Sequence, residues 1–132
     1  ALRGDPKFAE AHVNLGLALV RTGDREGGIR SFETALQYKP DLVDALSNLG
    51  CVLAEAGRHD EAFVRFERAL RVDPQNARTH FNYGVALSQR GLLGKARQHL
   101  EQAVRLAPDW PEPAERLRRL PGEAPATLSP RP

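Results

Sequence analysis

The sequence predicts an all-α fold built from stacked pairs of helices, on three observations. Four prolines recur at a spacing of 34 residues: Pro6, Pro40, Pro74 and Pro108. Counting the proline itself, seven positions of the repeat carry the same residue in all three intervals. Each interval also holds two stretches with apolar residues at three- and four-residue steps, the spacing of one helical face. A fixed period of this length indicates copies of one small unit that stack on each other.

The first copy shows how each unit is expected to fold. Its first helix runs from Phe8 to Arg21 and presents one apolar face to the core: Ala11, Leu15, Ala18 and Leu19. Gly23 and Asp24 interrupt the pattern, and the second helix runs from Arg25 to Tyr38. The other two copies repeat this arrangement, and the prolines end the second helices because proline disfavours helix at the preceding residue.

Small residues recur in the middle of the helices. A glycine occupies the same position in all three first helices: Gly16, Gly50 and Gly84. Each costs about 1 kcal/mol of helix propensity relative to alanine, so its recurrence predicts the close approach of another helix backbone. A second small column lies opposite, at Gly28, Ala62 and Ala96, and bulky residues fill the space beside these contacts: Phe32, Phe66 and Leu100.

The repeat spacing also predicts domain boundaries. We expect the end of a preceding repeat at 1–8, full repeats at 9–42, 43–76 and 77–110, a capping helix at 111–120, and a proline-rich, disordered tail at 121–132. Trp110 caps the terminal helix, with Pro111 and Pro113 in its first turn. The chain starts at Ala1 and contains no methionine, so we interpret it as a segment of a longer protein.

Composition excludes several classes of function. The net charge of +2 is too mild for a nucleic-acid-binding surface. No apolar run approaches the length of a membrane span, and the single cysteine, Cys51, fits a reducing, cytoplasmic location. The four histidines show no paired metal spacing, and His12 and His80 are interpreted as packing residues. We expect no catalytic residues, no metal and no cofactor, and therefore not an enzyme.

These features resemble the tetratricopeptide repeat, a helix-turn-helix unit of 34 residues. The clearest stretch is LSNLGCVLAEAGRHDEAFVRFERALRVDP, from Leu46 to Pro74. The departures are small: His12 and His80 stand at a bulky position, and Gly28 replaces the usual alanine. The resemblance implies a right-handed α-α superhelix, in which the first helices of the repeats line a concave groove and the second helices form the convex back.

Projected onto that groove, the resemblance gives a candidate peptide-binding site: Asn14, Leu17, Arg21, Asn48, Cys51, Glu55, Arg78, Phe81, Asn82, Val85 and Gln89. The asparagine column at 14, 48 and 82 resembles the asparagine ladder of the O-linked N-acetylglucosamine transferase repeats. A side-chain amide both donates and accepts, so such a column can pair with a peptide backbone. The alternative is that the amides bind neighbouring helices or water, and both interpretations stay open.

Another known use of the family is a clamp for the C-terminal carboxylate of chaperone tails. Val13 and Leu17 stand where that clamp needs a lysine and an asparagine, and Asn82 stands where it needs a second base. Only Asn48 and Arg78 match, so we do not expect this ligand. Val13, Leu17, Val20, Cys51, Phe81 and Val85 instead make the groove partly apolar.

The leading hypothesis is a non-catalytic scaffold that holds an extended or helical peptide of a protein partner. A second hypothesis is the substrate-recognition segment of a larger enzyme, such as a glycosyltransferase. A third is a structural module that forms homo-oligomers through exposed repeat ends. RNA binding is the weakest, because acidic residues (Glu10, Asp44 and Glu55) balance Arg21 and Arg78 in the groove.

Overall fold

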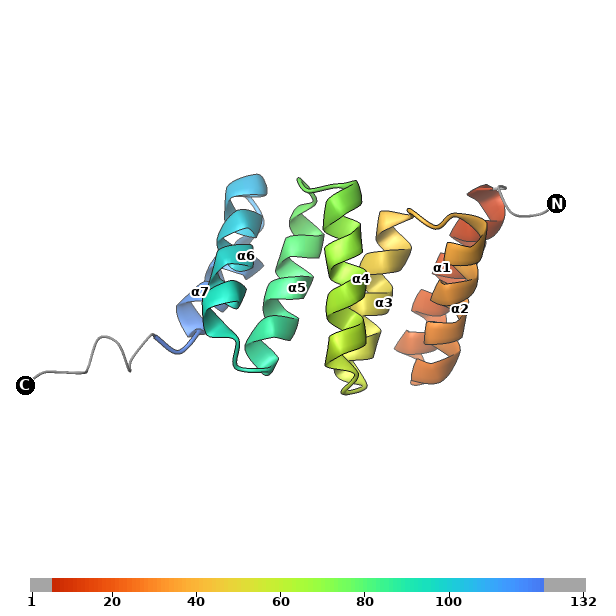
Figure 1. The fold of residues 1–132 in the computed structure, drawn as a ribbon, viewed down its shortest axis with the longest axis horizontal. Coiled ribbons are helices and arrows are strands. Elements are labelled where there is room, and N and C mark those ends of the chain that lie inside the picture. The colour runs from red at the N-terminus through yellow and green to blue at the C-terminus, as the bar shows by residue number, and fades with distance from the viewer. Residues whose placement is uncertain (1–5, 123–132) are drawn as a thin grey trace, which may run out of the picture. The chain divides into compact units, whose positions relative to one another are not determined.

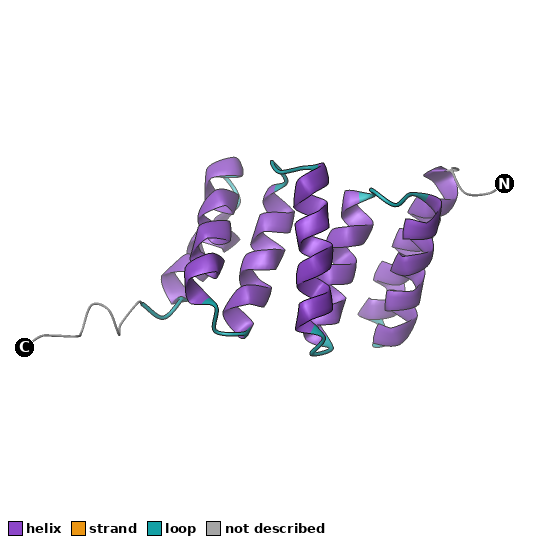
Figure 2. Cartoon of the chain, viewed as in Figure 1, coloured by secondary structure: helices purple, strands orange, loops and turns teal. Residues whose placement is uncertain are grey.

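The computed structural model describes residues 6–122, which form seven helices joined by short turns and contain no strand (Figure 1, Figure 2). The chain divides into two compact units, unit 1 (Ala1–Gln75) and unit 2 (Asn76–Pro132). The expected all-α repeat fold with a terminal helix is thus confirmed for this part of the chain. The expected preceding-repeat end at 1–8 and the tail at 121–132 lie largely outside the described residues.

Unit 1 holds two helix pairs: α1 (Pro6–Arg21), α2 (Arg25–Tyr38), α3 (Val43–Glu55) and α4 (His59–Val72). α2 packs against both α1 and α3, and α4 packs against α3. In Figure 1, α2 and α4 lie in front of α1 and α3. The first helices of the two repeats therefore share one side of unit 1, and the second helices share the other.

Unit 2 holds one helix pair and the terminal helix: α5 (Ala77–Gln89), α6 (Leu93–Leu106) and α7 (Pro111–Arg119). α6 packs against both α5 and α7. The side chain of Asn76 caps α5 by accepting a hydrogen bond from the backbone N–H of Thr79 at 2.9 Å. As expected, α7 begins after Trp110, and its first residue is Pro111.

The turn inside each pair depends on glycine. Gly57 has φ +83°, a left-handed conformation that residues with a Cβ adopt at a cost, and Gly23 and Gly91 are alike. Just after Gly57, the N–H of Arg58 donates to the carbonyl of Leu53 at 2.8 Å and closes the end of α3. This turn sends the second helix back along the first.

The glycine column of the first helices makes room for the bulky column of the second helices. A Cβ on Gly16 would lie 2.7 Å from the ring of Phe32, and a Cβ on Gly50 would lie 2.7 Å from the ring of Phe66. Both rings are fully buried. The close approach predicted at these glycines is therefore present, but at Gly16 and Gly50 side-chain rings rather than helix backbones fill the space.

The one departure in the small column, Gly28, is explained by Val20. A Cβ on Gly28 would collide with Cγ2 of Val20. In the second repeat, the equivalent positions are Ala54 and Ala62, both buried. The larger side chain on α1 is thus matched by the smaller residue on α2, and Val20 packs between the helices instead of facing the groove as predicted.

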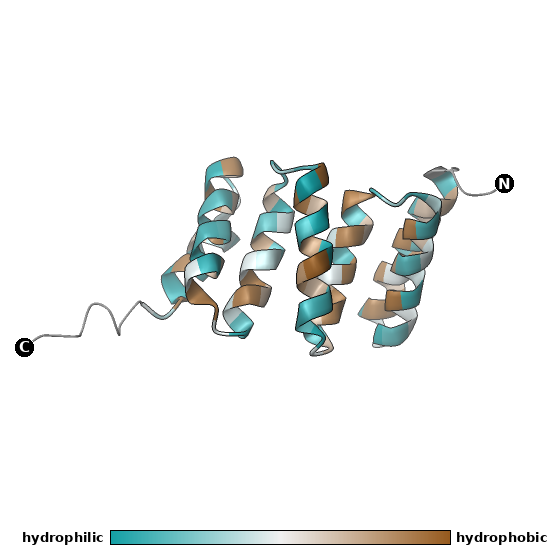
Figure 3. Cartoon of the chain, in the orientation of Figure 1, coloured by the Kyte–Doolittle hydropathy of each residue, from teal (hydrophilic) through white to brown (hydrophobic). Residues whose placement is uncertain are grey.

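The predicted inward face of the first helix was wrong: Ala11, Leu15 and Ala18 are exposed, and Leu19 is only half-buried. Leu15 is 47% exposed, whereas its repeat equivalent Leu49 is 0% exposed. In the second repeat, the same face of α3 packs against the preceding α2. No helix precedes α1 in the described residues, so this face stays open there. Hydrophobic and hydrophilic residues alternate around these helices (Figure 3).

Candidate functional site

All eleven predicted groove residues lie on the first helices, and none of them is buried. In unit 1 they form a surface that we call the first-helix face, on α1 and α3: Asn14, Leu17, Arg21, Asn48, Cys51 and Glu55. In unit 2 they lie on α5: Arg78, Phe81, Asn82, Val85 and Gln89. Helical periodicity places them there, because residues three, four and seven apart share a side of a helix.

Polar side chains on the first-helix face are available to a ligand. Asn14 is exposed and Asn48 is half-buried, and neither amide makes a hydrogen bond to another described residue. The neighbouring helices therefore do not occupy these two amides. Each retains one acceptor and two donor hydrogens for water or for a bound chain.

A pocket of about 240 Å³ opens where α1 meets the start of α3. Its lining combines two acidic side chains, two apolar ones and an amide: Glu10, Asp44, Val13, Leu42 and Asn14. Val13 is only 8% exposed, so it forms the floor rather than an open groove position. The pocket was not predicted from the sequence. The signal that could have indicated it is the acidic residue at the same repeat position in two successive repeats, Glu10 and Asp44.

The two acidic side chains of the pocket differ from the paired acids elsewhere in unit 1. Arg58 donates two hydrogen bonds to Glu61, at 3.1 and 2.9 Å, which lowers the pKa of the Glu61 carboxyl. Arg68 binds Asp41 at 2.8 Å. Glu10 and Asp44 are exposed and make no ion pair with a described residue.

In unit 2, Phe81 does not stand alone. Its ring packs against the ring of Trp110, with centroids 4.9 Å apart and planes tilted by 56°. The indole N–H of Trp110 donates to Glu112 at 2.7 Å, which holds the ring at the start of α7. From the sequence, Trp110 was expected only to cap α7, and its contact with Phe81 was missed.

Two histidines form a pair that was not predicted from the sequence. His80 on α5 and His99 on α6 place their Nδ1 atoms 3.0 Å apart, so one nitrogen donates to the other. Tyr83 lies against His99, with ring centroids 4.5 Å apart. The described residues hold no cluster of three or more metal-ligating side chains. We therefore interpret this pair as packing between α5 and α6.

Known protein families share this helix-pair geometry. Two family models, both described as tetratricopeptide repeat, match residues 7–75 and residues 53–120. A search of the curated proteins gave no match. None of the helices in residues 6–122 is long and apolar enough to cross a membrane.

Three solved structures are similar to this chain. A mutant O-GlcNAc transferase of Thermobaculum terrenum is 29% identical with a TM-score of 0.80, over 84% of this chain and 21% of the transferase chain. The first TPR of Spaghetti (RPAP3), bound to the HSP90 peptide SRMEEVD, is 16% identical with a TM-score of 0.85. The match covers 98% of this chain and 100% of the RPAP3 chain. MamA is 25% identical with a TM-score of 0.70, over 82% of this chain and 63% of the MamA chain. The chain thus spans about one fifth of the transferase.

Proposed function

Because the chain belongs to the tetratricopeptide-repeat family, we propose that it is a non-catalytic scaffold that binds a peptide segment of a protein partner. The binding surface in this proposal is the first-helix face of unit 1. We also propose the repeat boundaries that the sequence spacing predicts, with full repeats at 9–42, 43–76 and 77–110. The RPAP3 domain of similar fold binds a peptide, which is in keeping with this function.

One observation carries the proposal: Asn14 and Asn48 offer amides that no described residue binds. An amide that both donates and accepts can pair with a peptide group of either polarity. Packed helices lie about 8–10 Å apart, and an extended chain advances about 3.3 Å per residue. The two asparagines would therefore contact the backbone of two peptide residues about three positions apart, whatever the side chains of those residues.

Apolar side chains beside the amides supply the rest of the surface. Leu17 and Cys51 occupy the same repeat position on α1 and α3, and both are half-buried. They leave part of their area for an apolar side chain of the peptide, which adds affinity in proportion to the area removed from water. The clamp for acidic chaperone tails is not part of the proposal, because Val13 and Leu17 replace its lysine and asparagine.

We expect the double substitution Asn14→Ala with Asn48→Ala to weaken peptide binding about tenfold, since each lost hydrogen bond is worth about 0.5–1.5 kcal/mol. The probes are peptides selected on the wild-type chain from a random twelve-residue library, with affinity measured by fluorescence anisotropy. Far-UV circular dichroism should show unchanged helicity.

The matched control is Gln37→Ala with Gln98→Ala, which removes two exposed amides from the second helices α2 and α6. This control should bind the selected peptides like the wild type. Equal affinity of the Asn14/Asn48 variant and the control would contradict a role for the asparagines, and failure to select any peptide would contradict the proposed function itself.

A second candidate function is the recognition segment of a larger enzyme. The match to the O-GlcNAc transferase favours it, because 84% of this chain corresponds to only 21% of that protein. In this case the first-helix face would bind the peptide that the enzyme modifies. Sequencing the gene on both sides of this segment decides between an attached catalytic domain and none.

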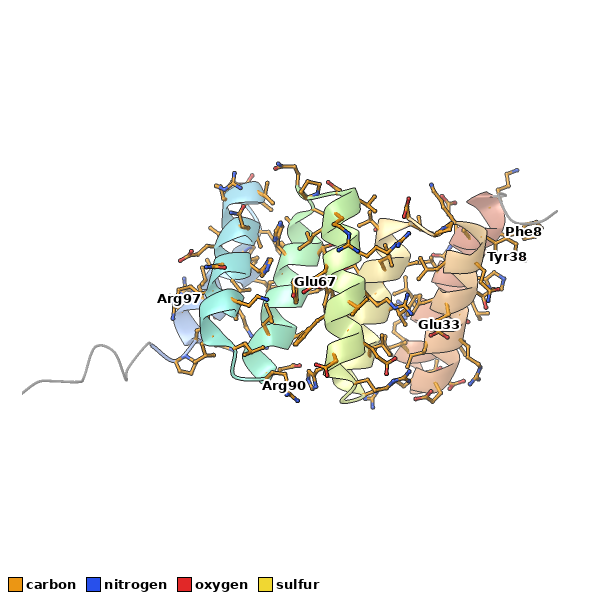
Figure 4. All side chains as sticks on the ribbon, in the orientation of Figure 1. Phe8, Glu33, Tyr38, Glu67, Arg90 and Arg97 are labelled. Carbon is orange, nitrogen blue, oxygen red and sulfur yellow. The ribbon has the colours of Figure 1, made fainter. Side chains whose placement is uncertain are left out.

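A third candidate is self-association through the open face of α1. The equivalent face of α3 is covered by α2, so the second helix of another copy can form the same contact on α1. Phe8, which is 41% exposed, extends this apolar surface. Its ring stacks on the ring of Tyr38, with centroids 5.6 Å apart (Figure 4). The occupant in this proposal is a second copy of this chain.

We expect Leu15→Ser to abolish such association, because it removes the most exposed large side chain of this face. Light scattering should show a wild-type mass that rises with concentration and a variant that stays near 14.6 kDa. The control Val64→Ser, at a 59% exposed position on α4, should associate like the wild type. A wild-type chain that stays monomeric at every concentration contradicts this candidate.

A further inference from the structure

The pocket between α1 and the start of α3 has a chemistry of its own. We propose that it binds the basic side chain, arginine or lysine, of a partner peptide that lies on the first-helix face. This inference rests on the proposed function and adds a sequence preference to it. The asparagines contact any peptide backbone, whereas this pocket would select one residue of the peptide.

The lining of the pocket suits the two parts of a basic side chain. Val13, which is 8% exposed, and the half-buried Leu42 provide an apolar surface for the methylene stem. Lysine and arginine bury such stems along apolar surface and keep the charged end near water. At the rim, Glu10 and Asp44 provide the negative charge that the cationic end requires.

Among residues 6–122, the two carboxylates have no cationic partner. Neither Glu10 nor Asp44 pairs with a described arginine or lysine, while Asp41 and Glu61 of the same unit do. Both carboxylates line the same small pocket, so one cationic group placed there would interact favourably with both. The amide oxygen of Asn14 adds an acceptor for a further N–H of the cationic group.

The size of the pocket favours one side chain over a free small molecule. Sites for drug-sized ligands usually measure about 300–1,000 Å³, whereas this pocket measures about 240 Å³. It is also confined to unit 1, because the third repeat carries Arg78 at the position of Glu10 and Asp44. Arg78 would not attract a basic side chain, so the proposed preference rests on unit 1 alone.

The test uses four acetylated pentapeptides of alanine whose central residue is arginine, lysine, glutamine or glutamate. Each is titrated into the whole chain at millimolar concentration, and backbone amide shifts are followed by NMR. We expect the arginine and lysine peptides to shift amides of residues 10–14 and 42–44, and the glutamine and glutamate peptides to leave them unchanged. Added salt should weaken the effect, because both carboxylates are exposed.

The decisive variant is Glu10→Gln with Asp44→Asn, which keeps the shape of the pocket and removes its charge. It should bind the arginine peptide at least tenfold more weakly than the wild type. The matched control is Asp60→Asn with Glu101→Gln, which removes two exposed charges from the second helices α4 and α6. Circular dichroism checks that both variants remain helical.

Two outcomes overturn the inference. One is an equal response to the arginine and glutamine peptides, and the other is unchanged affinity of the Glu10/Asp44 variant. The library peptides separate this failure from failure of the proposed function. Selected peptides that depend on Asn14 and Asn48 but bind the Glu10/Asp44 variant normally would overturn the pocket alone, whereas the absence of any selected peptide would overturn both proposals.

Discussion

Replacing Phe66 with alanine is expected to lower the free energy of unfolding by about 3–5 kcal/mol, the usual cost of truncating a buried phenylalanine. The ring is 0% exposed and lies against Gly50, at the centre of the α3–α4 pair. Without it, the helices cannot close onto the glycine, and a cavity remains. Since small domains have only about 5–15 kcal/mol in total, this loss is a large share of the stability.

Urea denaturation measures the effect, with circular dichroism to follow all helices. Trp110, the single tryptophan, lies in unit 2, so its fluorescence follows that unit separately. The control Val64→Ala truncates a side chain on the same helix that is 59% exposed and should cost about 0.5 kcal/mol or less. A loss below about 1 kcal/mol for Phe66→Ala would show that the ring does not hold the pair together.

This contact matters for the proposed function because it positions α3. Asn48 and Cys51 lie within two residues of Gly50 on α3, and Phe66 packs on Gly50. Loosening the α3–α4 pair would leave the amide and the apolar surface without a fixed position. Peptide affinity should therefore fall in the Phe66→Ala variant even in conditions where it remains folded.

Much of the fold could be predicted because the residue types within each repeat indicate how its two helices pack. A small residue on one helix and a large one on the next, as at Gly50 and Phe66, indicate which faces meet. The exposed Leu15 was not predicted, since it has the same periodicity as the buried Leu49. Periodicity tells which face of a helix would be covered, but not whether a covering helix is present.

The candidate site was predictable only as a set of positions. Helical spacing placed Asn14 and Asn48 on one side of unit 1, but the pocket depends on α1 lying close to the start of α3. The His80–His99 pair was missed for a similar reason. Its members lie on different helices, 19 positions apart, and the turn between α5 and α6 decides how they meet.

The replacement of Gly50 by valine has the second largest expected effect, a loss of about 3 kcal/mol in the free energy of unfolding. A Cβ at this position would lie 2.7 Å from two atoms of the Phe66 ring, and valine adds two further methyl groups. Overpacking of a well-filled core usually costs about 1–3 kcal/mol. Because the ring is fully buried, it has no free direction in which to move.

Gly94→Ala is the matched control, because Gly94 is also helical but a Cβ added to it would meet no atom within 4 Å. Alanine there should be neutral or stabilise the chain by up to about 0.5–1 kcal/mol, through helix propensity alone. If Gly94→Ala and Gly50→Val both proved destabilising to the same degree, the loss at Gly50 would not come from a collision with the ring.

The two large predictions are linked, and their combination separates collision from other costs. In a Phe66→Ala background the ring is gone, so valine at position 50 enters the cavity instead of colliding. Gly50→Val should then cost at least about 1 kcal/mol less than it does alone, as expected for residues in direct contact. If the two losses were additive, a collision between valine and the ring could not explain the loss at Gly50. The requirement for glycine would then come from the backbone of α3 rather than from the Phe66 ring on α4.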